Sequence, residues 1–77
     1  MWQETSEGLY QKFVFDDFKQ AFAFMTKVAE VAEARQHHPR WTNEWNKVEI
    51  WLSTHDADGQ ITDKDRELAK EIDKIKA

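Results

Sequence analysis

The sequence predicts an α+β domain in which a four-stranded antiparallel sheet carries two helices on one face. Alternating apolar and polar residues indicate strands in both halves of the chain, apolar residues at helical spacing follow each strand pair, and turn residues separate the strands. The expected order is strand, strand, helix, strand, strand, helix. No linker, repeat or low-complexity segment interrupts the 77 residues. We therefore expect residues 1–77 to form a single domain.

The first strand pair is predicted from the alternation over residues 9–15. One side of this strand carries Leu9, Gln11, Phe13 and Phe15. Because Thr5-Ser6-Glu7-Gly8 has the composition of a turn, it joins residues 9–15 to a short strand near Trp2. The result is an opening hairpin.

A long helix follows this hairpin. Asp16 or Asp17 can cap its first N–H groups, and Pro39 stops it soon after Arg35. Two apolar stripes run along it at helical spacing. We expect the first stripe to face the core and the second to face another subunit. The first consists of Phe18, Ala21, Phe22, Met25, Ala29 and Ala32, and the second of Phe24, Val28 and Val31.

A second hairpin and a final helix complete the predicted domain. The hairpin consists of residues 41–45 and 48–54 joined at Asn46-Lys47, with alternate side chains directed inward, namely Val48, Ile50 and Leu52. The final helix begins near Thr62, because Thr62-x-x-Asp65 resembles a capping box. Its inward residues are Leu68, Ile72 and Ile75.

The composition excludes several classes of partner. A formal charge of -4 argues against binding to a nucleic-acid backbone, which needs clustered Lys and Arg. No apolar stretch approaches the roughly 20 residues that span a bilayer, so we expect no membrane partner. Cysteine is absent, which excludes disulfides. Because no signal segment opens the chain, we expect a cytoplasmic protein.

All three histidines fall between predicted elements. His37 and His38 precede Pro39, and His55 follows Ser53-Thr54. Histidine has an ordinary pKa of about 6.5, so it can give or take a proton near neutral pH. If the sheet brings His55 near the pair, the site holds both an acid and a base. Three scattered surface histidines are the alternative, and the residues alone leave both interpretations open.

Metal sites are weaker alternatives. The histidines with Glu33 or Asp56 could supply metal ligands, but no His-Glu-x-x-His spacing occurs. Residues 54–65 also resemble a calcium-binding EF-hand loop at several positions: Asp56, Asp58, Gly59, Ile61 and Asp65. However, Thr54 occupies the first ligand position, and a predicted strand replaces the preceding helix. A turn followed by a helix cap is the simpler interpretation.

Aromatic and acidic side chains flank the histidines. Trp41, Trp45 and Trp51 could form flat walls for a planar heterocyclic ligand, although tryptophans on a small sheet more often pack in a core or an interface. Glu33 lies one helical turn before His37. It could orient a histidine or lie on a solvated helix face.

Four motifs of the chain occur together in one known family: Glu33-x-x-x-His37-His38-Pro39-x-Trp41, Asn46-Lys47-Val48, Leu52-Ser53-Thr54-His55 and Ile61-Thr62-x-x-Asp65. With this combination the sequence resembles the pterin-4a-carbinolamine dehydratases over nearly its whole length. The resemblance implies an enzyme that dehydrates a 4a-hydroxytetrahydropterin to the quinonoid dihydropterin. This reaction recycles the cofactor of aromatic amino acid hydroxylases and itself implies no metal or cofactor.

The resemblance also implies a role for each matching residue. His37 and His55 would be the acid/base pair, and His38 would mainly bind substrate. The other residues expected around the pterin are Glu33, Gln36, Pro39, Trp41, Ser53, Thr54 and Asp56. Asp65 would be a supporting carboxylate, as would Glu33. A homodimer or homotetramer is implied as well.

Two departures from the family pattern qualify these roles. Gln60 looks like one additional residue between the third histidine and Asp65, which leaves the role of Asp65 open. Members also commonly carry a further helix before the position matched by Trp2. The alternative function is a non-catalytic interaction module, because one family member binds and stabilises a transcription-factor dimer.

Overall fold

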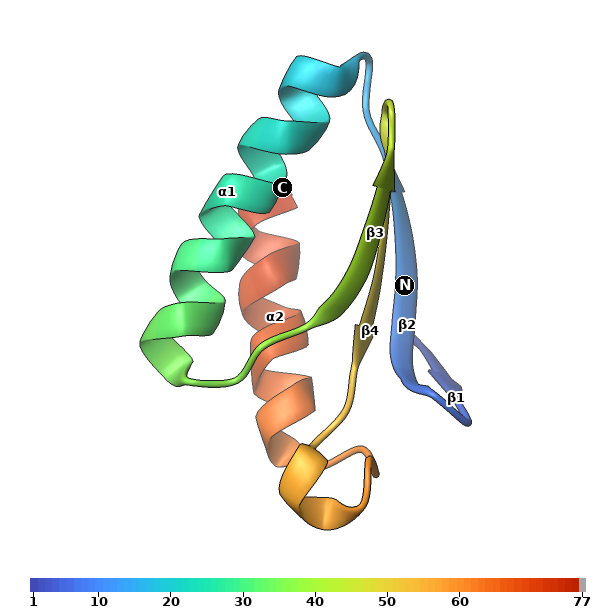
Figure 1. Ribbon diagram of the computed structural model, residues 1–77, viewed down its shortest axis with the longest axis vertical. Coiled ribbons are helices and arrows are strands. Elements are labelled where there is room, and N and C mark those ends of the chain that lie inside the picture. Colours follow the sequence, from blue (N-terminus) through green and yellow to red (C-terminus); the bar gives the residue numbers. More distant parts are fainter. Residues whose placement is uncertain (77) are drawn as a thin grey trace.

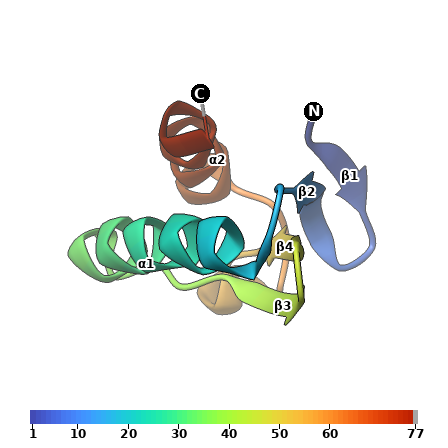
Figure 2. The same ribbon diagram turned by 90° about the horizontal axis from the view of Figure 1, so that it is seen from above.

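The computed structural model describes residues 1–76, and Ala77, the last residue of the predicted domain, lies outside them. The elements are β1 (Gln3–Thr5), β2 (Gly8–Val14), α1 (Phe18–Arg35), β3 (Arg40–Glu44), β4 (Lys47–Leu52), a short 3-10 helix η1 (His55–Ala57) and α2 (Asp63–Lys76). The strands form one antiparallel sheet in the order β1-β2-β4-β3. Both helices lie on the same face of this sheet (Figure 1, Figure 2). The predicted fold class is confirmed.

The core lies between the sheet and the two helices. In the antiparallel register Leu9 pairs with Leu52 and Phe13 with Val48, so the inward rows of β2 and β4 share one face. These four side chains and that of Ile50 are almost completely buried. The buried apolar residues of α2 are Leu68, Ala69 and Ile72. The predicted inward sides of both strands are therefore confirmed.

The predicted orientation of α1 was wrong in part. Phe24 and Val28, expected to face another subunit, are buried in the core. Phe18 and Phe22, expected in the core, are 47% and 54% exposed and stack on each other with ring centroids 5.7 Å apart. Ala29 is exposed and Met25 is partly buried, whereas Ala21 and Ala32 are buried as predicted.

Contacts with β2 explain this orientation. The ring of Phe24 lies 4.9 Å from that of Phe13 and 5.0 Å from that of Phe15, measured between centroids. Such aromatic contacts stabilise a packing beyond the area they bury. Since both stripes of α1 are apolar, hydrophobicity alone does not choose between them. The aromatic residues of β2 and the residues just after it decide which stripe packs inward.

The turn between β3 and β4 lies one residue earlier than predicted. It consists of Trp45 and Asn46, whereas Lys47 already pairs in the sheet. Asn46 makes two hydrogen bonds to the segment after β2. Its Nδ2 donates to Phe15 O and its backbone carbonyl accepts from Phe15 N, both at 2.9 Å. Strand β4 also ends earlier, at Leu52, and the expected strand end at Thr54 is instead an isolated bridge to Gln60.

The connections that carry the histidines meet at one end of the molecule. The segment between α1 and β3, the helix η1 and the start of α2 lie there, opposite the β3–β4 turn (Figure 1). Helix α1 closes at Gln36, whose φ of 52° is left-handed, with His37 N donating to Ala32 O. This reversal sends His37 back toward α2. No helix within residues 1–76 is long and apolar enough to span a membrane.

Candidate active site

All three histidines line one hollow of about 290 Å³. They come from two separate segments, His37 and His38 from the α1–β3 connection and His55 from η1. The other residues that line the hollow are Gln36, Ser53, Thr54, Asp56 and Lys64. The fold thus brings together three imidazoles that are up to eighteen positions apart in the sequence.

The chain turns sharply after β4, and this turn presents His55. The carbonyl of Thr54 accepts from Ala57 N and Gly59 N, both at 3.0 Å. Asp58 and Gly59 have φ values of 57° and 77°, a left-handed conformation that Asp and Gly tolerate well. Of the turn predicted over Asp56-Ala57-Asp58-Gly59, the last two residues form a turn, whereas the first two belong to the 3-10 helix η1.

His37 is directed inward to a buried carboxylate. Its side chain is only 12% exposed, and Nε2 lies 2.5 Å from Oδ1 of the completely buried Asp65. The second oxygen of Asp65 accepts from Thr54 Oγ1 and from Thr62 N, both at 2.8 Å. A buried carboxylate needs such partners because it has lost its hydration. Asp65 also lies in the first turn of α2, where the helix dipole favours negative charge.

Asp65 reaches His37 although Gln60 lies in the loop before it. The exposed Gln60 accepts from Thr54 N at 2.9 Å and donates its own N–H to Ala57 O at 3.1 Å. These two bonds hold Gln60 within the turn. The sequence-based question of whether Asp65 could reach the site is answered by its contact with His37.

His38 contacts a different carboxylate, that of Glu33. Its Nε2 lies 2.8 Å from Glu33 Oε1, and both side chains are exposed. Gln36 Nε2 donates to the other oxygen of Glu33 at 3.2 Å. The hydrogen bond from His38 lowers the pKa of Glu33 most, followed by that from Gln36 and by the charge of His38. The adjacent residues His37 and His38 therefore contact different carboxylates, those of Asp65 and Glu33.

We expect His38→Ala to raise the pKa of Glu33 toward its ordinary value of about 4.3. A group with a lowered folded-state pKa stabilises the fold above its unfolded pKa, and this contribution is lost as the pH falls through the folded value. Carboxyl NMR titration of wild type and variant measures the change. Gln36→Ala is the matched comparison and should give a smaller shift. An unchanged Glu33 titration in His38→Ala would contradict the assigned cause.

Some residues expected around the pterin do not line this hollow. Among residues 1–76, Glu33, Pro39 and Trp41 are not part of the lining, and Trp41 is partly buried against the core from β3. Trp45 lies at the far end, in the β3–β4 turn. Trp51 packs between Arg40, 4.2 Å from its ring centroid, and Tyr10, 5.2 Å between centroids. Aromatic walls of tryptophan are therefore not found around the histidines in this part of the chain.

Lys64 is a lining residue that sequence reasoning missed. It lies on the first turn of α2, directly before Asp65. The only sequence signal was its position beside a candidate carboxylate at a predicted helix start. A single lysine on a charged helix carries no distinguishing pattern.

The local structure does not resemble a calcium-binding loop. A strand, β4, precedes the turn where an EF-hand has a helix, and the Asp65 carboxylate is engaged by His37, Thr54 and Thr62. Within residues 1–76, no group of three or more His, Asp or Glu side chains is arranged to hold a metal ion.

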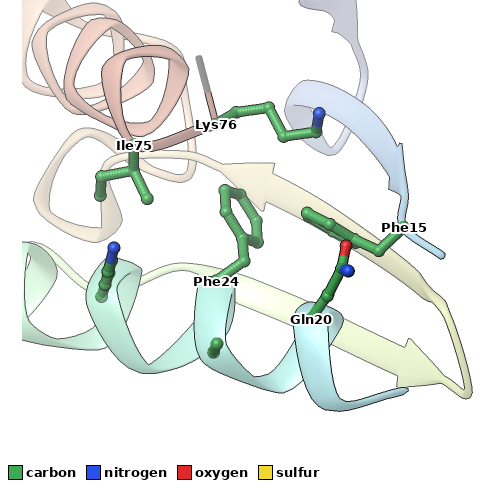
Figure 3. A pocket seen from close by; sticks show the side chains of 7 residues that line it. Phe15, Gln20, Phe24, Ile75 and Lys76 are labelled. Atoms are coloured by element: carbon green, nitrogen blue, oxygen red, sulfur yellow. The ribbon is translucent and has the colours of Figure 1, made fainter. Parts of the chain in front are cut away.

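Another hollow, of about 310 Å³, has a different chemical character. It lies between Phe15, the first half of α1 and the end of α2 (Figure 3). The lining consists of Phe15, Gln20, Ala23, Phe24, Lys27, Ile75 and Lys76, with Lys76 Nζ 5.3 Å from the Phe15 ring centroid. This lining contains no histidine and no carboxylate. Proton transfer is therefore better served by the hollow that the histidines line.

Comparisons with known proteins find relatives that match most of this chain. The family model described as Pterin 4 alpha carbinolamine dehydratase matches residues 1–75. A relative from Christiangramia forsetii, named as a candidate pterin-4-alpha-carbinolamine dehydratase, is 50% identical over 74 residues, which cover 96% of this chain and 75% of the relative. A relative with the same name from Prochlorococcus marinus is 51% identical over 75 residues, covering 97% and 77% of the two chains.

A solved structure is also similar throughout the fold. The crystal structure of a protein from Brucella melitensis described as a transcriptional coactivator/pterin dehydratase matches with a TM-score of 0.89 at 37% sequence identity. The match covers 96% of this chain and 80% of that chain.

Proposed function

Because the chain belongs to the pterin-4a-carbinolamine dehydratase family, we propose that it dehydrates a 4a-hydroxytetrahydropterin to the quinonoid dihydropterin and water. The observation that carries the proposal is a single hollow lined by three histidines, one of which is held by a buried carboxylate. The expected setting is the recycling of the tetrahydropterin used by aromatic amino acid hydroxylases.

The reaction needs one acid and one base. The bond between C4a and the hydroxyl oxygen breaks, the proton on N5 leaves, and a double bond forms between C4a and N5. No atom is oxidised or reduced overall. Hydroxide is a poor leaving group near neutral pH, so an acid must protonate it, while a base accepts the N5 proton. Imidazole can do either, because its ordinary pKa is near 6.5.

We assign the two proton transfers to His37 and His55. They reach the hollow from different segments, so they can act on different atoms of one bound pterin. The contact with Asp65 restricts the orientation of His37. His38, with Glu33 behind it, is assigned to substrate binding together with Gln36, Ser53 and Asp56. Pro39 and Trp41 stay predictions of the family resemblance.

The function is tested by the ultraviolet time course of dehydration. The 4a-hydroxytetrahydropterin is generated in situ by a hydroxylase, and its decay is compared with and without the protein. We expect a rate well above that of the spontaneous reaction and proportional to protein concentration. A decay that the protein leaves unchanged would contradict the enzyme assignment and favour the interaction function below.

A second candidate function is protein interaction. Phe18 and Phe22 expose about half of their surfaces and stack on each other, which leaves an apolar stripe on α1. Large exposed apolar residues in a cluster are typical of interaction surfaces. A homodimer or homotetramer, as the family resemblance implies, could use this stripe. The similar Brucella melitensis protein is described as a coactivator as well as a dehydratase.

A further inference from the structure

We infer that Thr62 and Thr54 are positioning residues that hold Asp65 against Nε2 of His37, which leaves Nδ1 of His37 to exchange protons with the substrate. This inference rests on the proposed function, and it changes the role of Thr54. The family resemblance implies that Thr54 contacts the pterin, whereas its hydroxyl is committed to the interior. The network consists of Thr62, Thr54, Asp65 and His37, and it joins the start of α2 to the α1–β3 connection.

The direction of each hydrogen bond follows from the hydrogens that the groups carry. A carboxylate can only accept, so the single hydroxyl hydrogen of Thr54 goes to Asp65 Oδ2, 2.8 Å away. Thr54 Oγ1 also lies 2.5 Å from Thr62 Oγ1. Since the hydrogen of Thr54 is already used, Thr62 must be the donor in this second bond. The hydroxyl of Thr62 therefore holds that of Thr54 in its donating orientation.

Two donors on Oδ2 leave Oδ1 of Asp65 for His37. Thr54 Oγ1 and Thr62 N both donate to Oδ2 at 2.8 Å, whereas Nε2 of His37 lies 2.5 Å from Oδ1. The hydrogen in this contact must be on Nε2, because the carboxylate has none. A neutral imidazole carries one N–H, so Nδ1 is then the basic nitrogen. In the imidazolium form, the Nδ1 proton is the one available for transfer.

Burial makes the network sensitive to a missing donor. Asp65 is completely buried, Thr54 is 6% exposed and Thr62 is partly buried, so water has limited access to the bond between Thr54 and Asp65 when the Thr62 hydroxyl is lost. Thr62 makes two hydrogen bonds in the network. Its backbone N–H donates to Asp65 Oδ2, which is one half of a capping box, and its hydroxyl donates to Thr54 Oγ1 across the loop. The valine substitution removes the hydroxyl while it retains the backbone N–H and the branched shape.

The test compares Thr62→Val with Thr62→Ser and with a distant control, Thr26→Val. Thr26 is exposed on α1, where its hydroxyl donates to Phe22 O at 3.0 Å. Histidine ¹⁵N NMR of the substrate-free protein reports which ring nitrogen of His37 carries hydrogen, and kinetics report kcat, KM and the pH profile. The wild type, Thr62→Ser and Thr26→Val should show the Nε2–H tautomer. Thr62→Val should loosen the contact between Asp65 and His37, so that a fraction of the molecules shows the Nδ1–H tautomer. Its kcat should be about fivefold to tenfold lower, with KM changed by less than about twofold.

Two results would overturn the inference. One is an Nδ1–H tautomer of His37 in the neutral wild-type protein, which needs no variant to fold. The other is Thr62→Val with wild-type tautomer and wild-type kcat. The NMR result does not depend on turnover. A wild type that shows the Nε2–H tautomer but does not accelerate dehydration would therefore overturn the proposed function and leave the network intact.

Discussion

Replacing His37 with alanine is expected to lower kcat for dehydration by about 10²- to 10⁴-fold, the usual contribution of a general acid or base. His37 lines the hollow, and its Nε2 contacts the buried Asp65 carboxylate. This contact orients the imidazole ring for proton transfer. His38 and His55 would still bind and polarise the pterin, which is why some activity should survive. Stopped-flow or continuous ultraviolet assays of the carbinolamine decay measure the loss.

Three comparisons separate this chemical effect from a structural one. His37→Gln retains an N–H group that can donate to Asp65 but cannot act near neutral pH, so its kcat should fall as far as that of His37→Ala. His38→Ala should mainly raise KM, because we assign His38 to binding. Circular dichroism and sedimentation should show the same fold and assembly for all three variants. Wild-type turnover in both His37 variants would rule out its role in proton transfer.

Asp65→Ala is expected to lower the free energy of unfolding by about 2–4 kcal/mol, because buried donors left without an acceptor cost about 1–3 kcal/mol each. Asp65 accepts from Thr54, Thr62 and His37 and has no exposed surface. His37 can recover part of the loss by turning toward the hollow. For a domain of this size, whose core supplies only a few kcal/mol, this is a large fraction of the total stability.

Asp63→Ala is the matched control for this prediction. Asp63 also lies in the first turn of α2, but its side chain is exposed. It should show only the helix-dipole effect, less than about 1 kcal/mol. Chemical denaturation at neutral pH gives both values. Equal losses in the two variants would show that Asp65 acts through the helix dipole alone and that its buried hydrogen bonds contribute little net stability.

The sequence predicted the strands, the helices and the side chains that face the core well, except for the side chains of α1. Period-two alternation identifies the inward sides of β2 and β4 directly, because a half-buried strand has two chemically different sides. Helix α1 has two apolar stripes, so the same reasoning is ambiguous there. Phe13 and Phe15 selected Phe24 for the core and left Phe22 exposed. Such a choice depends on side chains from another element.

The candidate site was also predicted only in part from the sequence. Residue types and their positions between elements identified the three histidines, and motif spacing indicated the family. The sequence could not show that His37 meets Asp65, 28 positions away, because this contact joins separate segments and only the folded turn shows where Gln60 is placed. Nor could it distinguish Trp41, which packs against the core, from a residue that lines the hollow.

By itself, the sequence determined the order of elements, the strand faces and the set of imidazoles, because these follow from local periodicity and residue chemistry. Only the tertiary structure decided the rotation of α1, the carboxylate partner of each adjacent histidine and the inward bonds of Thr54 and Thr62. Those features depend on contacts between distant segments. Their geometry is set by how two helices and a sheet pack together, which no local pattern records.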